Sequence, residues 1–450
     1  MGRIKIVFWV SLALVAVLWL AADPDALQAT GLFALRGAMV QLSGLLGMAC
    51  MSLAMILALR PRWPERWIGG LDRMYRLHKW LGIGGLVLAI VHWLWSQGPK
   101  WAVGLGWLTR PARSPRPAPV NLAEEVLRSW RGVAEDIGEW AFYAAVLLIA
   151  IALIRRIPYR LFYQTHRLLA VAYLVLVFHA VVLMNFSYWA SPLGLVVAVL
   201  LAHGSWAAVI VLLRRVGARR KVGGTITRLQ FYPDLHVLEG EIETAPDWPG
   251  HKPGQFAFVT TDHAHEAHPF TIASAWTPSE HRLTFITKAL GDYTRGLPDA
   301  LRIGQPVSVE GPYGCFTFDD GLARQIWVGG GIGITPFIAR LKQLAMDREA
   351  YSSRPHPQTI DLFHTTADWS DDAIAKLTAD AAAAGIRLHV LHDPQDGRLT
   401  GDRIRAEVPE WRQASIWFCG PPGFGAALRQ DFARHGLPAG RFHQELFEMR

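Results

Sequence analysis

The stretch that decides the fold is LFYQTHRLLAVAYLVLVFHAVVL, residues 161–183. It is apolar over a length that crosses a bilayer as a helix, since the hydrocarbon core takes about 20 residues. It also carries His166 and His179. A polar side chain at membrane depth is costly, so each histidine is a candidate functional residue.

A second apolar stretch, residues 77–95, carries His78 and His92 at nearly the same separation. A rise of about 1.5 Å per residue puts the two histidine levels on the order of 20 Å apart. A neutral imidazole is a strong iron ligand, and two of them give an iron suited to electron transfer. The four histidines therefore predict two haems at two depths. The alternative is that each histidine only bonds a neighbouring helix.

The spacing between His166 and His179 does not fit this prediction for a straight helix. At about 100° per residue, the step from His78 to His92 keeps one helix face, whereas the thirteen-residue step from His166 to His179 turns about 140° away. Either that helix is distorted or its two haems approach from different sides. His203, in a later apolar stretch, has no matching partner and is expected to be structural.

Composition divides the chain near residue 214, with an apolar first half and an ordinary water-soluble second half. The net charge of +8 does not indicate nucleic-acid binding, because the basic residues cluster at the ends of apolar spans. Cys50, Cys315 and Cys419 have no CxxC spacing, which argues against a disulfide framework or a zinc or iron–sulfur site.

The first half predicts six membrane spans, with an uncleaved first helix preferred over a signal peptide. Lys and Arg are concentrated on one side of these spans, so both termini and the second half are expected in the cytoplasm. The protein is thus predicted to be integral to the plasma (inner) membrane. The predicted spans are residues 4–22, 31–59, 77–97, 137–154, 161–184 and 191–213.

The long loop between the third and fourth spans, residues 98–136, includes the Pro-rich segment RPARSPRPAP at 110–119. That composition indicates irregular structure. Residues 121–130 could form an amphipathic helix on the membrane surface.

The second half begins with short alternating runs, which predict a small antiparallel β-barrel. The runs are TITRLQFY, HVLEGEIE, QFAFVT, RLTFITKAL and QPVSVEGPYG. Within them lies HPFTIAS, residues 268–274, where Phe270 can lie along a flavin ring while Thr271 bonds near its reactive nitrogen. GDYT, residues 291–294, opens a short helix whose N–H groups could hold a pyrophosphate.

From Gln325 onward strands alternate with helices, which predicts a doubly wound parallel sheet. The Gly-rich turn GGGIGITP, residues 329–336, lets the backbone approach a dinucleotide phosphate, although its spacing is not GxGxxG. CGPP, residues 419–422, follows a later strand at the edge where such sheets bind ligands.

Together, HPFT, GDYT, GGGIGITP, CGPP and the terminal FHQELF resemble the ferredoxin–NADP reductase-type module. Attached to six spans with paired histidines, they make the whole chain resemble the NADPH oxidase and ferric reductase family in a bacterial-type form. The resemblance implies three domains: a transmembrane di-haem domain (1–215), an FAD-binding β-barrel (216–320) and an NAD(P)-binding α/β domain (321–450). The fold class is then a six-helix transmembrane bundle followed by these two soluble domains.

The resemblance also implies the site residues. The haem ligands would be His78 with His166 on the cytoplasmic side and His92 with His179 on the far side. The expected catalytic residues are Thr271, Cys419 and Phe447: Thr271 would hold the flavin, Cys419 would lie near the nicotinamide, and Phe447 would cover the flavin ring until nicotinamide displaces it. The remaining cofactor contacts would come from His268, Pro269, Phe270, Ser274, Gly291, Thr294, Gly330, Gly331, Gly333, Thr335, Gly420 and Pro421. The Arg expected to bind a 2′-phosphate is absent from DLFHTT, residues 361–366. In its place His364 and the hydroxyls of Thr365 and Thr366 would bind a 2′-phosphate only weakly, which leaves NADPH and NADH both open.

These features predict a transmembrane oxidoreductase that moves electrons from cytosolic NAD(P)H through FAD and two b-type haems to an acceptor on the far side. Oxygen, giving superoxide, is the first candidate acceptor. The alternatives are a ferric chelate, a quinone or a periplasmic acceptor protein. Rivals from another class are a membrane-anchored flavin reductase whose spans are only a scaffold, and a haem-binding proton-pathway protein.

Overall fold

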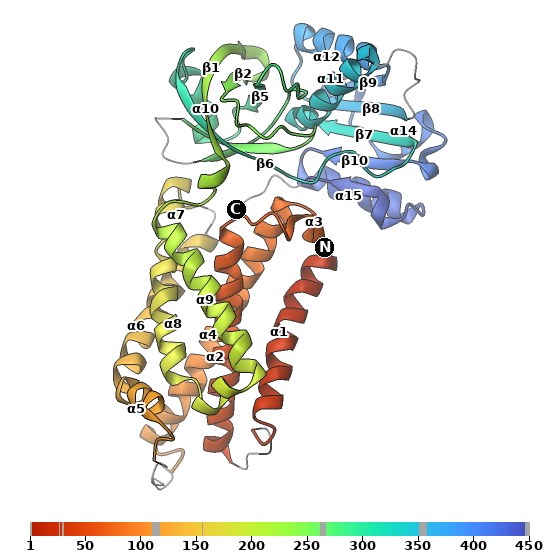
Figure 1. The fold of residues 1–450 in the computed structure, drawn as a ribbon. Helices are drawn as coiled ribbons and strands as arrows, with labels where there is room; N and C mark the ends of the chain where they lie inside the picture. The colour runs from red at the N-terminus through yellow and green to blue at the C-terminus, as the bar shows by residue number, and fades with distance from the viewer. Residues whose placement is uncertain are drawn as a thin grey trace. The chain divides into compact units, whose positions relative to one another are not determined.

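The computed structural model describes residues 2–26, 28, 31–109, 118–154, 156–261, 267–350 and 358–445. The chain divides into two compact units (Figure 1). The first comprises chiefly Met1–Ile68 and Arg73–Val216, and the second Gly69–Asp72 and Gly217–Met449. The predicted boundary between the second and third domains, at residues 320–321, stays a prediction.

The first unit is a helical bundle. Its described residues include six helical segments long and apolar enough to cross a membrane, which confirms the six predicted spans and an integral membrane protein. In Figure 1, α2 lies beside α9 and α6 beside α8. The spans are α1 (Gly2–Ala22), α2 (Leu32–Ala58), α4 (Leu71–Gly104), α6 (Arg131–Leu153), the pair α7 (Tyr159–His166) and α8 (Leu169–Leu183), and α9 (Pro192–Leu212). Two short helices, α3 (Glu65–Ile68) and α5 (Leu122–Ser129), lie between them.

The helix predicted near residues 121–130 is α5, and its N-cap explains where it begins. The Asn121 side chain accepts a hydrogen bond from the Glu124 N–H at 2.9 Å, as N-cap residues do. Most of the Pro-rich segment, residues 110–117, lies outside the described residues.

The fifth span is not one continuous helix, because α7 ends at His166 and α8 begins at Leu169. The junction is tightly wound: the N–H groups of Leu168, Ala170 and Val171 each bond the carbonyl three residues earlier. A turn of this type advances about 120° per residue rather than about 100°. Several such residues recover on the order of 80° of the 140° mismatch between His166 and His179. The span is therefore distorted, which is the first of the two alternatives.

The third span, α4, is longer than predicted and continues through Pro99. Proline has no N–H to donate to the carbonyl of Trp95, four residues earlier. Arg36 of α2 replaces that donor: its Nε donates to the Trp95 carbonyl at 3.2 Å and its Nη2 to the Ser96 carbonyl at 3.0 Å. A side chain from the neighbouring helix thus supplies the hydrogen bond that the Trp95 carbonyl loses at the proline.

The second unit begins with a six-stranded antiparallel sheet in the order β4-β3-β6-β1-β2-β5, which a bridge from Ile272 to Phe285 closes toward a barrel. Alternate residues such as Ile226, Ile242 and Leu283 fill its apolar interior. The strands are β1 (Lys221–Tyr232), β2 (Val237–Thr244), β3 (Phe256–Thr261), β4 (His268–Thr271), β5 (Arg282–Lys288) and β6 (Pro306–Tyr313), with α10 (Asp292–Ala300) after β5.

A five-stranded parallel sheet in the order β11-β10-β7-β8-β9 follows. Side chains alternate between two buried clusters, Trp327 and Leu362 entering one and Ile326 and Phe363 the other, so both faces are covered, as in a doubly wound fold. The strands are β7 (Arg324–Gly330), β8 (Thr359–Thr366), β9 (Arg387–His392), β10 (Ser415–Cys419) and β11 (Phe442–Gln444). The helices are α11 (Thr335–Ala350), α12 (Asp371–Ala384), α13 (Asp393–Asp396), α14 (Gly401–Glu407) and α15 (Pro422–Arg434).

Candidate functional site

The four histidines predicted as metal ligands meet in the two predicted pairs. The ring centroids of His92 and His179 lie 6.1 Å apart, and those of His78 and His166 lie 5.8 Å apart. His203 joins neither pair, because its Nδ1 bonds Val199 of its own helix and it is exposed on α9.

Backbone carbonyls orient three of these imidazoles. His78 Nδ1 lies 2.9 Å from the Ala54 carbonyl oxygen, His92 Nδ1 2.9 Å from that of Val40, and His179 Nδ1 2.8 Å from that of Ala134. A carbonyl can only accept, so each Nδ1 carries the proton and leaves the Nε2 lone pair available to a metal.

His166 differs from the other three. Its Nδ1 is buried and has no hydrogen-bond partner among the described residues. Its ring stacks on Phe162, one turn earlier, with a centroid separation of 5.1 Å and an interplanar angle of 27°. Aromatic packing, rather than a carbonyl, therefore orients this imidazole.

The donor set fits two haems. Two imidazoles bound to one metal at about 2 Å have ring centres about 6 Å apart, which both pairs satisfy. Neutral nitrogen ligands on both sides suit haem iron. His78 and His166 would hold one haem, and His92 and His179 the other.

Two glycines that sequence reasoning did not single out make room for the far pair. A Cβ at Gly138 of α6 would overlap the His179 ring, and one at Gly44 of α2 would lie 3.1 Å from His92 Nδ1. Only a glycine inside an apolar span hints at such a role from sequence. The carbonyls of Val40, Ala54 and Ala134 carry no sequence signal, because every residue has one.

The predicted flavin residues lie on β4 and just beyond it. Thr271 is buried, and its Oγ1 has no hydrogen-bond partner among the described residues, which leaves this hydroxyl available to a flavin nitrogen. The His268 ring stacks on Tyr293, with centroids 3.6 Å apart, and burial lowers the pKa of His268 to about 4. Phe270 and Pro269 are partly buried beside them. The buried Thr271 hydroxyl, next to the aromatic ring of Phe270, therefore fits an FAD site.

Ser274 and Thr294 are already engaged within the protein. Ser274 Oγ accepts the Thr284 N–H at 3.2 Å. Thr294 Oγ1 accepts the N–H groups of Leu290 and Gly291, each at 3.0 Å. The hydroxyl of Thr294 therefore closes the turn before α10. The N–H groups of the first helical turn, from Asp292 on, are the ones open to a pyrophosphate.

The Gly-rich turn and the CGPP turn lie against each other at the carboxyl edge of the parallel sheet. A Cβ at Gly333 would overlap the Cys419 carbonyl, and one at Gly330 would lie 3.0 Å from Pro421. Gly331 has φ +56°, a left-handed conformation that glycine adopts without strain. The structure thus brings together the two predicted dinucleotide segments, with Thr335 bonding the Ile332 carbonyl at 2.8 Å and Gly420 beside Gly330.

Cys419 is fully buried, and burial raises the pKa of its thiol, as does the nearby Glu445. The Glu445 carboxyl is itself buried, which raises its pKa well above the usual range. Glu445 is a candidate functional residue that the terminal motif contained but that sequence reasoning gave no role. Phe447, predicted to cover the flavin, lies outside the described residues.

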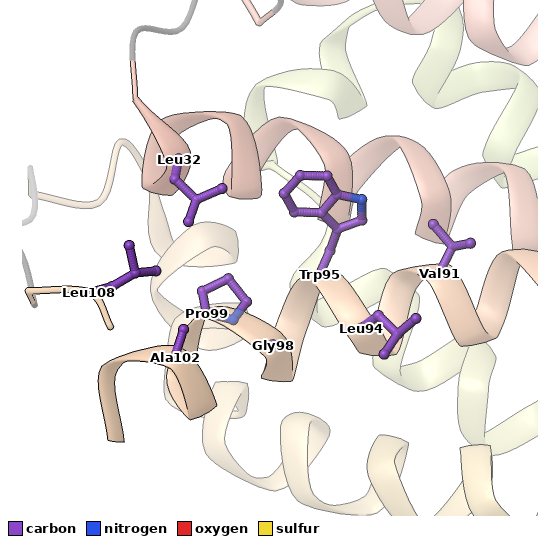
Figure 2. Close-up of a pocket in the computed structure, with 8 residues that line it drawn as sticks. All are labelled: Leu32, Val91, Leu94, Trp95, Gly98, Pro99, Ala102 and Leu108. Carbon is purple, nitrogen blue, oxygen red and sulfur yellow. The ribbon is translucent and has the colours of Figure 1, made fainter. Parts of the chain in front are cut away.

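Two pockets open at the end of the bundle that holds His92 and His179. One, of about 450 Å³, is lined by polar groups that include Asp23, Gln41, Arg128, Arg131 and Tyr188. The other, of about 350 Å³, lies between α2 and α4 and is apolar (Figure 2). Leu32 lines it from α2, and Val91, Leu94, Trp95, Gly98, Pro99 and Ala102 from α4, with Leu108 beyond.

Two protein families match this chain in the order that the fold suggests. Residues 43–177 match the ferric reductase like transmembrane component, and residues 223–317 match an FAD-binding domain. The chain matches the NADPH oxidase and ferric reductase family. The fold class predicted from the sequence is confirmed.

Individual relatives match over different parts of the chain. A heavy chain of the superoxide-generating NADPH oxidase of Dictyostelium discoideum is 25% identical over 354 residues, covering 72% of this chain and 64% of its own. A flavohemoprotein of Pseudomonas putida is 25% identical over 205 residues, covering 44% of this chain and 51% of its own. The chain spans about half the length of the first curated relatives that it matches.

Among solved structures, the cytochrome P450 reductase of Amycolatopsis is similar to this chain, with 23% identity and a TM-score of 0.41. The alignment covers 51% of this chain and 70% of that one.

Proposed function

We propose that this protein is a transmembrane oxidoreductase that moves electrons from cytosolic NAD(P)H, by way of FAD and two b-type haems, to an acceptor on the far side of the membrane. Bound FAD would supply the conversion of a two-electron hydride into single electrons, and haems held by the paired imidazoles would supply one-electron transfer. The match to a ferric reductase like transmembrane component and an FAD-binding domain in one chain supports this proposal.

The observation that carries the proposal is the pairing of four histidines at two depths. His78 and His92 are fourteen residues apart on α4, and each faces a histidine of the α7–α8 span. A scaffold would not need imidazoles in matched pairs with Nδ1 held by carbonyls. If the protein were only a membrane-anchored flavin reductase, nothing would explain why the four histidines meet in two pairs.

Oxygen, giving superoxide, is the first proposed acceptor, and a ferric chelate is the second. The polar pocket beside Asp23, Gln41 and Arg131 favours these water-soluble acceptors. The apolar pocket of Figure 2 favours the remaining candidate, a quinone, because its lining offers isoprenoid chains an apolar contact.

A reduced-minus-oxidised spectrum of the purified protein tests the proposal. We expect a b-type haem signal that falls by about half in a His92→Ala, His179→Ala double variant, because one of two centres is lost. His203→Ala, which removes a histidine outside both pairs, is the control and should leave the signal unchanged. Absence of the signal, or its persistence at full strength in the double variant, would refute the two-haem function.

The acceptor is tested separately. NAD(P)H consumption is measured with cytochrome c reduction that superoxide dismutase suppresses, and compared with reduction of a ferric chelate and of a short-chain quinone. Superoxide as the main product supports oxygen. If only a ferric chelate or only a quinone raises the rate of NAD(P)H consumption, that compound is the acceptor.

A further inference from the structure

The carboxyl ends of β8 and β9 form the edge where a dinucleotide-binding sheet meets the adenosine ribose. The two strands are parallel and end together, Thr365 pairing with Leu391 and Thr366 with His392. At this position an acidic side chain bonds the 2′-hydroxyl of NADH, whereas a basic one accommodates the 2′-phosphate of NADPH. The groups at this edge therefore bear on which nucleotide the protein uses.

The three groups that the sequence offers to a 2′-phosphate are already engaged. His364 Nδ1 lies 3.1 Å from the Gly329 carbonyl, and burial lowers the pKa of His364, so its ring is neutral near pH 7. The Thr366 hydroxyl donates to the Asp368 carbonyl at 2.9 Å. The Thr365 hydroxyl donates to the carboxylate of Asp393. None of the three side chains carries a positive charge, and none has a hydrogen-bond donor that is not already used.

Asp393 places a negative charge at this edge. It follows β9 directly, and it lies close enough to His364 to favour the protonated ring, although burial outweighs that effect. The Thr365 hydroxyl occupies one carboxylate oxygen and fixes the orientation of the group. The carboxylate has further lone pairs, which can accept a ribose hydroxyl.

Several basic side chains near this edge have acidic or carbonyl neighbours. Lys342 of α11 and Lys376 of α12 line a pocket with His364 and Thr366. Lys376 pairs with Glu239 at 2.8 Å, and Lys342 lies near Asp380 and Glu239. Lys288 of β5 pairs with Asp368. Arg403 of α14 donates to the carbonyls of Asp396 and Gly397 and so closes the turn after α13. These neighbours reduce the positive charge available to a 2′-phosphate, and a phosphate at the end of β9 would approach Asp393 against its charge.

We propose that the protein prefers NADH over NADPH and that Asp393, held by Thr365, determines this preference. The inference rests on the proposed function, whose nucleotide it specifies. The Asp393 carboxylate accepts a hydrogen bond from the adenosine ribose, and it repels a phosphate at the 2′ position. Thr365 acts as a positioning residue through Asp393.

The first test measures kcat/KM of the full-length, FAD-loaded protein for NADH and for NADPH, with ferricyanide as an acceptor that takes electrons from the flavin. We expect NADH to be preferred about tenfold or more, mostly through KM. Equal or better use of NADPH by the unmodified protein would overturn the inference, whatever the behaviour of any variant.

The second test changes the carboxylate. In Asp393→Asn the preference for NADH should fall about tenfold through a lower KM for NADPH, with flavin content unchanged. Asp396→Asn is the matched control, because Asp396 lies in the same turn and its carboxylate accepts the His392 N–H at 2.8 Å. An unchanged preference in flavin-replete Asp393→Asn would contradict the role of Asp393.

A binding measurement separates this inference from the proposed function. Calorimetric titration with AMP and with 2′-phospho-AMP needs no electron transfer, and tighter binding of AMP is expected. If ferricyanide is reduced but the haems are not, the transmembrane function fails while the nucleotide preference can still hold. If both nucleotides reduce the haems equally well, the preference fails and the function stands.

Discussion

At the scale of the residue, the four paired histidines differ in how the protein holds them. Carbonyls fix the Nδ1 atoms of His78, His92 and His179, whereas His166 relies on the ring of Phe162. A hydrogen bond at Nδ1 orients an imidazole and raises its basicity as a ligand. The pair that contains His166 is therefore the less constrained of the two.

Gly138 of α6 leaves the space that the His179 ring occupies. Gly138→Ala should displace the His179 ring, because the added methyl group would overlap it. Overpacking of this kind costs about 1–3 kcal/mol, and the displaced ring can no longer face His92. We expect the haem content of the purified protein, measured as the pyridine haemochrome, to fall from about two to about one per chain.

Gly132→Ala is the control for that substitution. Gly132 lies six residues, just under two turns, earlier on α6, and a Cβ there would meet no atom within 4 Å. It should retain the full haem content. Full haem content in Gly138→Ala as well would show that the packing around His179 is looser than the structure indicates.

Sequence reasoning singles out residues whose own side chain carries the proposed chemistry, such as the four histidines and Thr271. The Gly-rich turn is visible for a different reason, because a run of glycines marks a backbone that can approach a phosphate closely. Sequence reasoning fails for backbone partners such as the Ala134 carbonyl, which only tertiary packing brings to a ring. It also left open that the Thr365 hydroxyl binds a 2′-phosphate. In the folded sheet this hydroxyl donates to the carboxylate of Asp393, which is far along the chain.

At the scale of the element, α4 shows how a helix continues through an internal proline. Pro99 leaves the Trp95 carbonyl without its helical donor, and Arg36 supplies two charged donors at that point. Figure 2 shows Trp95 and Pro99 on the same stretch of α4, beside the apolar pocket. The proline and the arginine should therefore be energetically coupled.

A double-mutant cycle tests that coupling. Arg36→Met should lower the free energy of unfolding by about 1–2 kcal/mol, because a partly buried acceptor loses a charged partner. In a Pro99→Ala background, the restored N–H should reduce this cost by roughly 1 kcal/mol. Thermal unfolding in detergent, followed by tryptophan fluorescence, measures both effects.

Arg131→Met is the comparison for the cycle. Arg131 pairs with Glu135 one turn along α6, and both side chains are about half exposed, so its loss should cost less than about 1 kcal/mol. Strict additivity of Arg36→Met and Pro99→Ala would contradict the proposed replacement of the missing donor.

The elements themselves were largely predictable, and the misses have physical reasons. Long apolar runs predicted all six spans. The break between α7 and α8 was not predictable as a location, since Arg167 and Leu168 are ordinary helix formers. The strand β11 is three residues long and owes its structure to pairing with β10, which local sequence does not show.

At the scale of the whole molecule, buried neutral histidines make the stability of the second unit depend on pH. His251 is 8% exposed, its Nε2 donates to the Ser274 carbonyl at 3.0 Å, and its buried Nδ1 has no partner among the described residues. Burial lowers the pKa of His251 from 6.5 to about 4. A proton on Nδ1 would have no acceptor in the folded protein.

Acidification should therefore destabilise this unit between pH 6.5 and pH 4. Above that range His251 is neutral in both states, and within it the unfolded chain binds a proton that the folded chain does not. The free energy of unfolding should fall by up to about 3 kcal/mol over the range, with no further loss from this group below it. His268 acts in the same direction, because burial also lowers its pKa to about 4.

Flavin release on heating, followed by fluorescence at several pH values, measures this dependence in the full chain. In His251→Gln the amide can still donate to Ser274 but cannot be protonated, so the midpoint should fall less steeply with decreasing pH. The same slope in both proteins would assign the acid sensitivity to other groups.

The tightly wound turn between α7 and α8 also bears on how related proteins are found. In a straight helix, two histidines share a face when they are about fourteen residues apart, and a thirteen-residue spacing would be rejected. Here a few residues of tighter winding return both rings toward one side. A sequence search for spans of this kind should accept both spacings, and an alignment should not insert a gap to force them to agree.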